Sequence, residues 1–322
     1  MSRSRYDERV QLVRSRFANR RAFLQSAAAI AAGPTLVSLS CVAGNPSMRD
    51  RRAVRFGIVT DCHYADTNFA GTRFYRESLD KLSECVDRMN AERVSFLIEL
   101  GDFKDQGTPA VESRTLAYLR KVEDVFRGFR GPRYHVLGNH DMDSLSKSQF
   151  LANVENTGID PSRNYYSFNV RGLHCVVLDA NYRADGADYD HGHFDWTDAN
   201  IPPQELDWLR QDLAASNGRA VVFVHQLLDG QGPLYVKNAP EVRQVLQESG
   251  KVLAVFQGHH HEGAYSRIEG IHYYTLKGVV EGSGLENNSY AIVEPKRDHD
   301  LIVTGCRKAV SRDLCGTIGG CS

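Results

Sequence analysis

The sequence predicts an α/β fold, and two features of its 322 residues support this prediction. Short apolar, β-prone runs alternate with longer stretches of helical spacing, an order that favours parallel strand pairing in the first half of the chain. Short polar blocks follow directly on several of these runs, which places reactive side chains at the ends of neighbouring strands. After residue 41, about 280 of the 322 residues remain, enough for one large α/β domain with a sizeable core.

Strands and helices are expected to alternate along most of the chain. The candidate strands are Val54–Thr60, Val94–Leu100, Arg133–Leu137, Tyr165–Val170, Leu173–Leu178, Ala220–Val224, Val252–Phe256, Ile271–Leu276 and Tyr290–Val293. The candidate helices are Phe74–Asn90, Glu112–Phe129, Ser144–Val154, Pro203–Ser216 and Pro240–Gln247. The late strands are rich in Tyr and Ile and are joined by short turns, which indicates an added antiparallel portion.

The overall charge excludes one class of partner. The chain carries 39 basic and 40 acidic residues, a formal net charge of −1. Because no global basic field exists, we expect no nucleic-acid binding, and any anion site must be local. The charge is uneven at the N-terminus, where seven arginines lie within residues 1–21.

Residues 1–41 have the pattern of an export signal. The arginine-rich start is followed by an alanine-rich, charge-free stretch, which is typical of a signal peptide and too weak and broken for a membrane-spanning helix. Asn19–Gln25 resembles the bacterial twin-arginine motif, which implies the twin-arginine export machinery as a partner and a periplasmic or envelope location. Cys41 could carry a lipid anchor, the only membrane attachment expected, or cleavage could occur near it. A basic amphipathic helix is the alternative, and a cytoplasmic location would then follow.

The C-terminal cysteines could hold the end of the chain. Cys306, Cys315 and Cys321 could supply a disulfide that fixes this end, and three free thiols are the alternative that the sequence leaves open. The other divisions that we expect are a linker over 42–52, one folded domain over 53–314 and a tail over 315–322.

Five short polar blocks stand out because each follows an apolar, β-prone run. Together they contain seven candidate metal ligands and two further histidines, His140 and His260, in an order that occurs rarely by chance. The carboxyl ends of neighbouring strands are where an open α/β sheet gathers its chemistry. The blocks are Asp61-Cys62-His63, Gly101-Asp102, Gly138-Asn139-His140-Asp141, His225 and Gly258-His259-His260-His261.

Alternation along an extended chain indicates which side chains of a block face a common point. Asp61 and His63 then point the same way, and the cysteine between them points elsewhere. His259 and His261 likewise share one face and could reach two different metals, with the histidine between them turned away. Asp102 has two carboxylate oxygens and could hold one metal on each, as a two-metal site requires.

The remaining blocks supply further ligands and a proton donor. Asn139 offers a neutral amide oxygen, and His225 ends an apolar run at a position where a structural histidine would otherwise be the ordinary interpretation. His140 points away from the ligands and is our candidate general acid for the leaving oxygen. We expect Asp141 to fix the tautomer of His140 and to keep it protonated.

The balance of charges supports the assignment of these residues to a single two-metal site. Two divalent ions bring four positive charges and Asp61 with Asp102 two negative ones, while the histidines and Asn139 are neutral ligands. The remaining positive charge suits a phosphoryl group together with a hydroxide. Bound ions would lower the pKa of a bridging water and orient in-line attack, so hydrolysis by that hydroxide is the economical mechanism.

The five blocks resemble the complete signature of the calcineurin-like metallophosphoesterase superfamily, spread over residues 54–281. The resemblance implies a four-layer α-β-β-α sandwich, in which two β-sheets lie between helices, and it implies His140 as the acid. Asp105 stands where a purple acid phosphatase would have tyrosine, which argues against that branch. The implied ligands are Asp61, His63, Asp102 and His261 for one ion, and Asp102, Asn139, His225 and His259 for the other.

A finer resemblance lies in five segments, Tyr64-Ala65-Asp66, Arg73–Leu79, Gly263-Ala264-Tyr265, Leu276–Glu281 and Gly305-Cys306-Arg307. They are similar to the manganese-dependent ADP-ribose/CDP-alcohol diphosphatase family. His63 and the loop before Gln204 depart from the pattern of that family. The resemblance implies hydrolysis of a pyrophosphate bond in a small nucleotide-like substrate, with manganese as the expected ion and Fe, Zn or Co as alternatives.

Substrate contacts are expected from two side chains and one loop. Arg76 and Tyr265 are candidates for substrate binding. The polar, aromatic loop Asp188–Trp196 could line the substrate pocket, with its rings stacking on a base. A surface loop packed on its own side chains is the alternative.

The leading hypothesis is a dinuclear-metal phosphohydrolase that cleaves a phosphoanhydride or phosphodiester bond. A cyclic nucleotide phosphodiesterase and a broad-specificity phosphomonoesterase are alternatives within the same chemistry. An envelope-anchored binding protein with a metal site is the non-enzymatic alternative. Such a protein should have lost a metal ligand or His140, and this chain has lost none of them.

Overall fold

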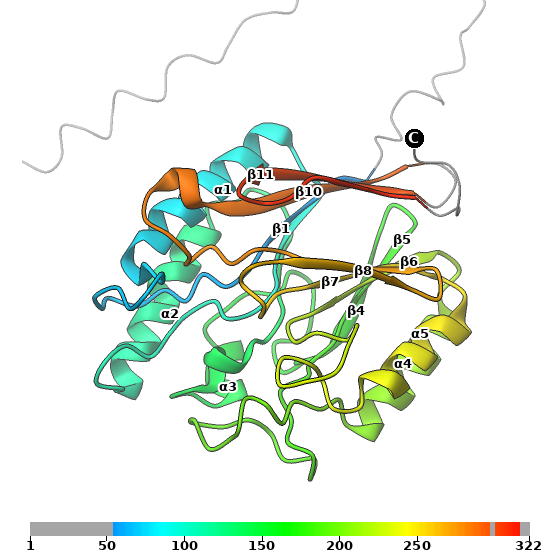
Figure 1. Ribbon diagram of the computed structural model, residues 1–322, viewed down its shortest axis with the longest axis horizontal. Helices are drawn as coiled ribbons and strands as arrows, with labels where there is room; N and C mark the ends of the chain where they lie inside the picture. The colour runs from blue at the N-terminus through cyan, green and yellow to red at the C-terminus, as the bar shows by residue number, and fades with distance from the viewer. Residues whose placement is uncertain (1–53, 297–299, 316–322) are drawn as a thin grey trace, which may run out of the picture. The chain divides into compact units, whose positions relative to one another are not determined.

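The structure is a computed structural model that describes residues 54–296 and 300–315 (Figure 1). The predicted export segment, the candidate lipidation site Cys41, the linker and Cys321 lie outside the described residues. No helix among the described residues is long and apolar enough to cross a membrane.

Two six-stranded sheets form the framework. The first has the order β12-β11-β10-β1-β2-β3 and the second the order β4-β5-β6-β7-β9-β8. The strands of the first are β1 (Phe56–Val59), β2 (Phe96–Glu99), β3 (Arg133–His135), β10 (Ser289–Pro295), β11 (Leu301–Arg307) and β12 (Arg312–Leu314). Those of the second are β4 (Tyr166–Val170), β5 (Leu173–Val177), β6 (Arg219–Val224), β7 (Val252–Gln257), β8 (Ala264–Ile268) and β9 (Ile271–Thr275).

Helices cover the outer face of each sheet. Figure 1 shows α1 and α2 on one side and α4 and α5 on the other, and each pair shares an apolar cluster with its own sheet. Single helical turns lie at Tyr75–Glu77, Asn139–Met142 and Leu285–Asn287. The longer helices are α1 (Ser78–Glu92), α2 (Glu112–Phe126), α3 (Lys147–Leu151), α4 (Pro203–Ala215) and α5 (Ala239–Ser249).

A third apolar cluster joins the two sheets to each other. Phe56 on β1 stacks on Phe96 of β2 at 4.8 Å and meets Phe223 of β6 and Phe256 of β7 edge-on, each at 5.7 Å between ring centroids. Offset and edge-on aromatic pairs add to the free energy gained from burial alone. Helix, sheet, sheet and helix are therefore packed in that order, and the predicted four-layer sandwich is confirmed.

The strand directions follow the alternation seen in the sequence. Pairing is parallel along β1-β2-β3 and along β5-β6-β7-β9. It is antiparallel in the late hairpins β8-β9 and β10-β11-β12, as the short turns indicated. Three strands were not predicted: β8 is polar, β12 is short, and β11 contains Gly305, so none shows a clear apolar alternation.

One local prediction needs correction, and one alternative that the sequence left open is decided. The helix expected over Ser144–Val154 is only α3, because Ser146 caps it with a side chain that accepts the backbone N–H of Gln149 at 3.1 Å. Among the three C-terminal cysteines, Cys306 is a free thiol whereas Cys315 is disulfide-bonded, so three free thiols are excluded. Cys62 is buried in the cluster between the first sheet and its helices, which confirms that it points away from its neighbours' common face.

Candidate metal centre

The predicted ligand blocks all follow the carboxyl ends of parallel strands. Asp61, Asp102 and Asn139 come after β1, β2 and β3 of the first sheet, whereas His225 and His259 come after β6 and β7 of the second. Parallel pairing carries each set to one edge of its own sheet. The two edges meet, because residues of both sets lie within ligand distance of one another.

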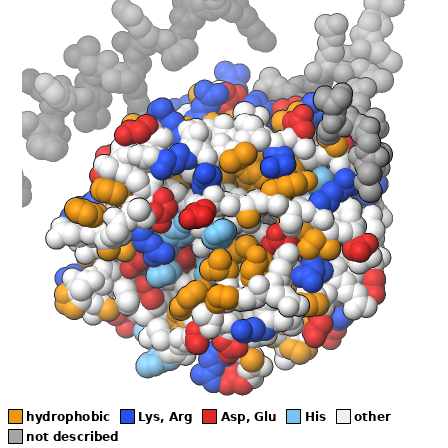
Figure 2. Space-filling view, in the orientation of Figure 1, with side chains coloured by type: hydrophobic (Ala, Val, Ile, Leu, Met, Phe, Trp, Pro, Cys, Tyr) orange, Lys and Arg blue, Asp and Glu red, His pale blue; other side chains and the backbone are white. Residues whose placement is uncertain are grey.

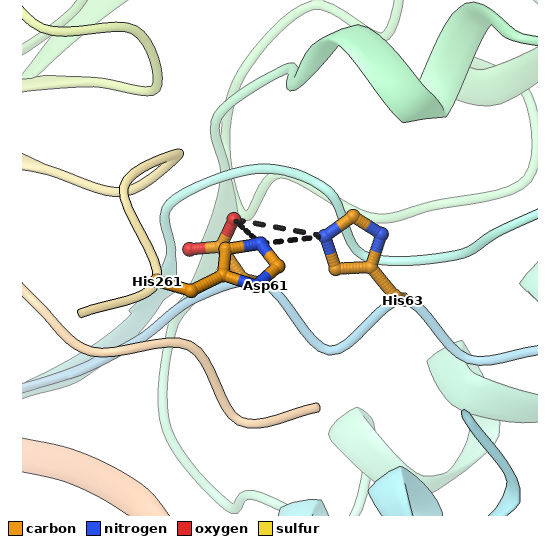
Figure 3. Close-up of side chains that lie close together, drawn as sticks. All are labelled: Asp61, His63 and His261. Carbon is orange, nitrogen blue, oxygen red and sulfur yellow. Dashed lines mark hydrogen bonds and ion pairs between the residues drawn. The ribbon is translucent and has the colours of Figure 1, made fainter. Parts of the chain in front are cut away.

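One group consists of Asp61, His63 and His261 (Figure 3). The Nε2 atoms of the two histidines lie 3.1 Å apart, and Oδ1 of Asp61 lies 3.3 Å from Nε2 of His261 and 3.8 Å from Nε2 of His63. The side chains of Asp61 and His63 are wholly buried. Three donor atoms thus point toward one place from two sheets.

A second group consists of Asp102, His225 and His259. Oδ2 of Asp102 lies 3.1 Å from Nε2 of His225, and the ring centroids of His225 and His259 are 5.0 Å apart. The same carboxylate oxygen lies 3.4 Å from Nε2 of His63, a member of the first group. Asp102 therefore stands between the two groups.

The donor atoms have the chemistry that divalent cations require. Nε2 of His259 and Oδ1 of Asn139 are buried and have no hydrogen-bond partner within the described part of the chain. Buried polar atoms are rarely left in this state unless an ion or water satisfies them. A mixed set of imidazole, carboxylate and amide donors suits Mn, Fe, Zn or Co, so these residues fit such ions.

The opposite ring nitrogens are engaged by the protein. Nδ1 of His225 donates to the carbonyl of Leu100 at 2.8 Å, and Nδ1 of His261 lies 2.6 Å from Oε1 of Glu281. A partner at Nδ1 fixes the tautomer that leaves a lone pair on Nε2, the arrangement usual around metal-ligating histidines. Both rings are therefore oriented as ligands before any ion binds.

Burial and charge set the ionisation of the buried ligands. Burial and the neighbouring His225 lower the pKa of His259 to about 3, so its imidazole is neutral at pH 7. Burial alone would raise the pKa of Asp102, but His225, His140 and His63 hold it well below its usual range. His259 thus presents a neutral imidazole and Asp102 an ionised carboxylate, the forms that bind metals.

The backbone at the ligands differs from the extended chain that the sequence suggested. Asp61, His63, Asp102 and His259 have φ values of 53°, 45°, 56° and 66°, in the left-handed region that non-glycine residues rarely adopt. Hydrogen bonds hold these turns, including Asp61 N to Gly101 O at 3.0 Å and His63 N to Asp102 O at 2.8 Å. Such strain persists where surrounding structure enforces it, commonly at functional sites.

His140 lies beside the first group, with its ring centroid 4.6 Å from that of His63. Its Nδ1 is 3.5 Å from Oδ2 of Asp105 and 3.6 Å from Oδ2 of Asp143. Burial would lower the pKa of His140, but Asp102, Asp143 and Asp105 outweigh it and raise the pKa. These carboxylates therefore favour the protonated form of the His140 ring.

The structure corrects the role expected of Asp141. Its carboxylate accepts the backbone N–H groups of Gly138, Asp102 and Phe103 at 2.8, 3.1 and 3.0 Å, which ties together the loops after β2 and β3. A Cβ at Gly138 would collide with the Asp102 backbone, so only glycine allows this approach. The partners of the His140 ring are instead Asp105 and Asp143.

Asp105, Asp143 and Lys104 also belong to the site, although the sequence did not lead us to predict them. Lys104 is buried and forms an ion pair with Asp143 as well as a hydrogen bond with the His140 carbonyl. Oδ2 of Asp105 lies 3.4 Å from Nδ1 of His63. Burial alone would raise the pKa of Asp105, but hydrogen bonding with His63 and the charge of His140 outweigh burial and lower this pKa. The signal available was their position, since each follows a predicted ligand block within four residues.

A cavity of about 740 Å³ opens beside the two groups. Figure 2 shows pale-blue histidine side chains on this face with acidic and basic side chains around them. The cavity is of the size that small-molecule sites have. Its lining consists of Thr72, Arg73, His259, His260, His261, Glu262, Lys277, Gly278, Glu281 and Lys308.

The two predicted substrate-binding residues lie elsewhere. Arg76 is exposed, pairs with Asp66 and Asn68, and is absent from the cavity lining. Tyr265 lines an adjoining cavity of about 160 Å³ and bonds through its hydroxyl to Nδ1 of His272 at 2.9 Å. Arg73 is the arginine at the cavity beside the ligands.

The sequence allowed the loop Asp188–Trp196 either to line the substrate pocket or to pack on its own side chains. Different parts of the loop agree with each of these two interpretations. Tyr189 is buried and stacks on Phe194 with ring centroids 4.0 Å apart, as in a loop packed on itself. Trp196, however, is 43% exposed, and its ring lies 5.8 Å from that of His259. The end of the loop therefore places an accessible aromatic ring beside the candidate centre.

Comparison with known proteins agrees with this geometry. A manganese-dependent ADP-ribose/CDP-alcohol diphosphatase of Oryza sativa subsp. japonica is 27% identical over 305 residues, which cover 81% of this chain and 93% of that protein. A probable cyclic nucleotide phosphodiesterase of Fibrobacter succinogenes is 22% identical over 233 residues, 69% of this chain and 78% of that protein. A solved dimetal phosphatase from Danio rerio has a TM-score of 0.71 at 22% identity, covering 82% of this chain and 99% of that one.

The family is established by a match that spans most of the folded domain. Residues 54–263 match the family model described as calcineurin-like phosphoesterase. This stretch contains the ligand blocks from Asp61 to His261, and the related diphosphatases agree with a metal-dependent phosphoester hydrolase. The chain belongs to the calcineurin-like phosphoesterase family.

Proposed function

We propose that the protein is a dinuclear-metal phosphohydrolase that cleaves a phosphoanhydride bond in a small nucleotide-like diphosphate. The observation that carries the proposal is the pair of donor groups on either side of Asp102, each with three buried or nearly buried ligand side chains. The names of the relatives, manganese-dependent diphosphatases, support the substrate class and manganese.

In this proposal each group holds one ion, and Asp102 belongs to both. Asn139 completes the group of His225 and His259, since its Oδ1 is buried and unpartnered among the described residues. When bound, two such ions lower the pKa of water and polarise phosphoryl oxygens. The other set is Asp61, His63, Asp102 and His261.

The protein's own residues supply the proton and the orientation. His140 donates a proton to the leaving oxygen, and Asp105 and Asp143 keep that proton on the ring by raising the pKa of His140. Lys104 fixes Asp143 through their ion pair. Asp105 also faces His63, so one carboxylate orients both a ligand and the acid.

Trp196 supports a substrate that contains a base. An exposed tryptophan beside a ligand histidine offers a flat apolar surface on which a nucleobase can stack. This feature suits a cyclic nucleotide as well, and the name of the Fibrobacter relative favours a cyclic nucleotide phosphodiesterase as the second candidate.

A substrate panel tests the proposal. The metal-loaded protein is assayed with added Mn²⁺ on ADP-ribose, CDP-choline, cyclic AMP and p-nitrophenyl phosphate. We expect the highest kcat/KM for the two diphosphates. A preference for cyclic AMP would select the second candidate, a preference for p-nitrophenyl phosphate would indicate a phosphomonoesterase, and turnover of none would overturn the proposed class.

We also propose that the protein is exported, on the basis of Arg20, Arg21 and the alanine-rich stretch after them. Cell fractionation tests this, with Arg20→Lys/Arg21→Lys as the variant. We expect the double substitution to retain the protein in the cytoplasm, whereas an unchanged distribution would contradict twin-arginine export.

A further inference from the structure

Two lysines on the wall of the metal-site cavity have no counter-charge. Lys277 and Lys308 both line the cavity that His259 and His261 also line. Neither side chain forms an ion pair or hydrogen bond with any residue that the structure describes, whereas most other cations near the centre are paired. An unpaired cation in a concave site is a binding feature for an anion.

The other charged groups of the wall do not neutralise them. Glu281 is engaged by His261 at 2.6 Å and lies 3.8 Å from Nε of Arg73. This carboxylate is therefore already shared between two partners. Glu262 is the remaining carboxylate, and it is exposed. The two lysines are therefore the cations of the wall that form no ion pair with a described residue.

The lysines come from different sheets. Lys277 follows β9 of the second sheet, and its stem packs over Gly263, where a Cβ would lie 2.9 Å from its Cγ. Lys308 follows β11 of the first sheet, and its backbone N–H donates to the carbonyl of Asn288 at 2.9 Å. The stem of Lys277 and the backbone of Lys308 are thus held in place, whereas the ammonium ends of the two side chains can adjust. Both ammonium groups can therefore reach one ligand in the cavity.

We infer that Lys277 and Lys308 bind one of the two phosphoryl groups of a diphosphate substrate. This group is the one that water does not attack and that leaves as a phosphate. The inference rests on the proposed hydrolysis of a phosphoanhydride. In that reaction water forms a bond to one phosphorus and releases one proton to the solvent, and the bond from this phosphorus to the bridging oxygen breaks. The electron pair stays on the departing phosphate, which takes up a proton from His140.

The departing phosphate gains negative charge as the bond breaks, and fixed positive charge at that position stabilises the transition state more than the ground state. A substrate with a single phosphoryl group places nothing there. The two lysines would therefore select diphosphates over monoesters and over simple diesters.

Lys277→Gln, Lys308→Gln and the double variant test the inference, with Lys296→Gln as the matched control. Lys296 is exposed and lies just after Pro295, the end of β10 remote from the loops that carry the ligands. Each protein, loaded with Mn²⁺, is assayed at constant ionic strength on ADP-ribose and on bis(p-nitrophenyl) phosphate, a diester with one phosphoryl group.

We expect each single substitution to lower kcat/KM for ADP-ribose about tenfold, the effect of one lost charge-assisted contact. Activity on the diester should change less than about twofold, the control should match the wild type, and Lys277→Arg should restore part of the loss. Equal losses on both substrates, or none on ADP-ribose, would overturn the inference. A wild type that hydrolyses the diester but not ADP-ribose would overturn the proposed diphosphatase as well, and one that hydrolyses neither would overturn the phosphohydrolase.

Discussion

The carboxylate of Asp141 accepts the backbone N–H of Asp102, with Oδ2 and N 3.1 Å apart. The same oxygen accepts the N–H of Gly138 at 2.8 Å, and Oδ1 accepts that of Phe103 at 3.0 Å. A carboxylate can accept all of these hydrogen bonds because it is an acceptor only. Asp141 therefore maintains the spacing of two ligand loops and does not act on His140.

Asp141→Asn should consequently lower stability and metal affinity together. The amide has one acceptor oxygen, so at least one buried N–H loses its partner, and we expect a loss of about 2–4 kcal/mol in the free energy of unfolding. Urea denaturation measures it. Asp207→Asn is the control, since the Asp207–Arg210 pair is exposed and should contribute little. Unchanged stability of the Asp141 variant would contradict the structural role.

Asp102→Ala should remove both ions, because its carboxylate faces both donor groups. His261→Ala should weaken only one, since His261 belongs to one group. Metal analysis by plasma mass spectrometry after dialysis distinguishes the two variants. Retention of two ions by Asp102→Ala would refute the shared position, and equal loss from both variants would show that the two ions bind as one unit.

His140→Ala should lower kcat about 10²- to 10⁴-fold on substrates whose leaving group requires a proton. The loss should be much smaller when the leaving group is p-nitrophenolate, which departs without protonation. Metal content should be unchanged because His140 belongs to neither ligand set in the proposal. A loss of the same size for both leaving groups would show that His140 is not the proton donor.

Trp196→Ala should raise KM for ADP-ribose by about 5- to 100-fold, the effect expected when one base loses its stacking partner. Trp196→Phe should retain most of the affinity. KM for a diphosphate diester without a base should not change. If both substrates suffer equally, Trp196 acts by positioning His259 rather than by contacting the substrate.

Stability should fall at alkaline pH because of His135, which is buried between Glu123 at 3.1 Å and Glu99 at 3.5 Å. Burial alone would lower the pKa of His135, but the two carboxylates raise it from 6.5 to about 9. Since the folded-state pKa is the higher one, this contribution is complete below pH 6.5 and is lost as the pH rises through about 9.

The pH-dependent contribution of His135 amounts to about 3 kcal/mol at most. Urea denaturation at several pH values measures it. His135→Gln should be less stable than the wild type at pH 6 and should lose less stability between pH 6.5 and 9. The exposed His193→Gln serves as control, and parallel pH profiles for the wild type and His135→Gln would show that His135 is not the titrating group.

The ligands could be placed from the sequence because strand ends are encoded locally. Val54–Thr60 and Ala220–Val224 are apolar runs, and whatever follows such a run in a parallel sheet arrives at the same edge. The left-handed turns at Asp61 and Asp102 could not be foreseen, because they depend on hydrogen bonds between loops far apart in the chain. The side chains that the rule of alternation selected do lie in the two donor groups, even though the backbone is not extended there.

The same limit explains the error at Asp141 and the omission of Asp143. Adjacency in sequence suggested that Asp141 would serve its neighbour His140, but a single helical turn at Asn139–Met142 rotates the two side chains apart. Asp143 returns to the ring one turn later. Lys308 lies in a segment without regular patterning near it, so only the folded chain could show that it lines the cavity. The loop that ends at Trp196 was already a candidate for the substrate pocket, and the ring of Trp196 lies beside that of His259.

The aromatic cluster of Phe56, Phe96, Phe223 and Phe256 fixes the position of one sheet relative to the other. Asp61 and Asp102 extend from the sheet of Phe56 and Phe96, whereas His225 and His259 extend from the sheet of Phe223 and Phe256. Any sliding of one sheet over the other would separate donor atoms that must act together. The relative positions of the donor atoms thus depend on an apolar interface between the sheets, remote from the substrate. Ions bound by residues of both sheets would in turn cross-link the two halves of the sandwich.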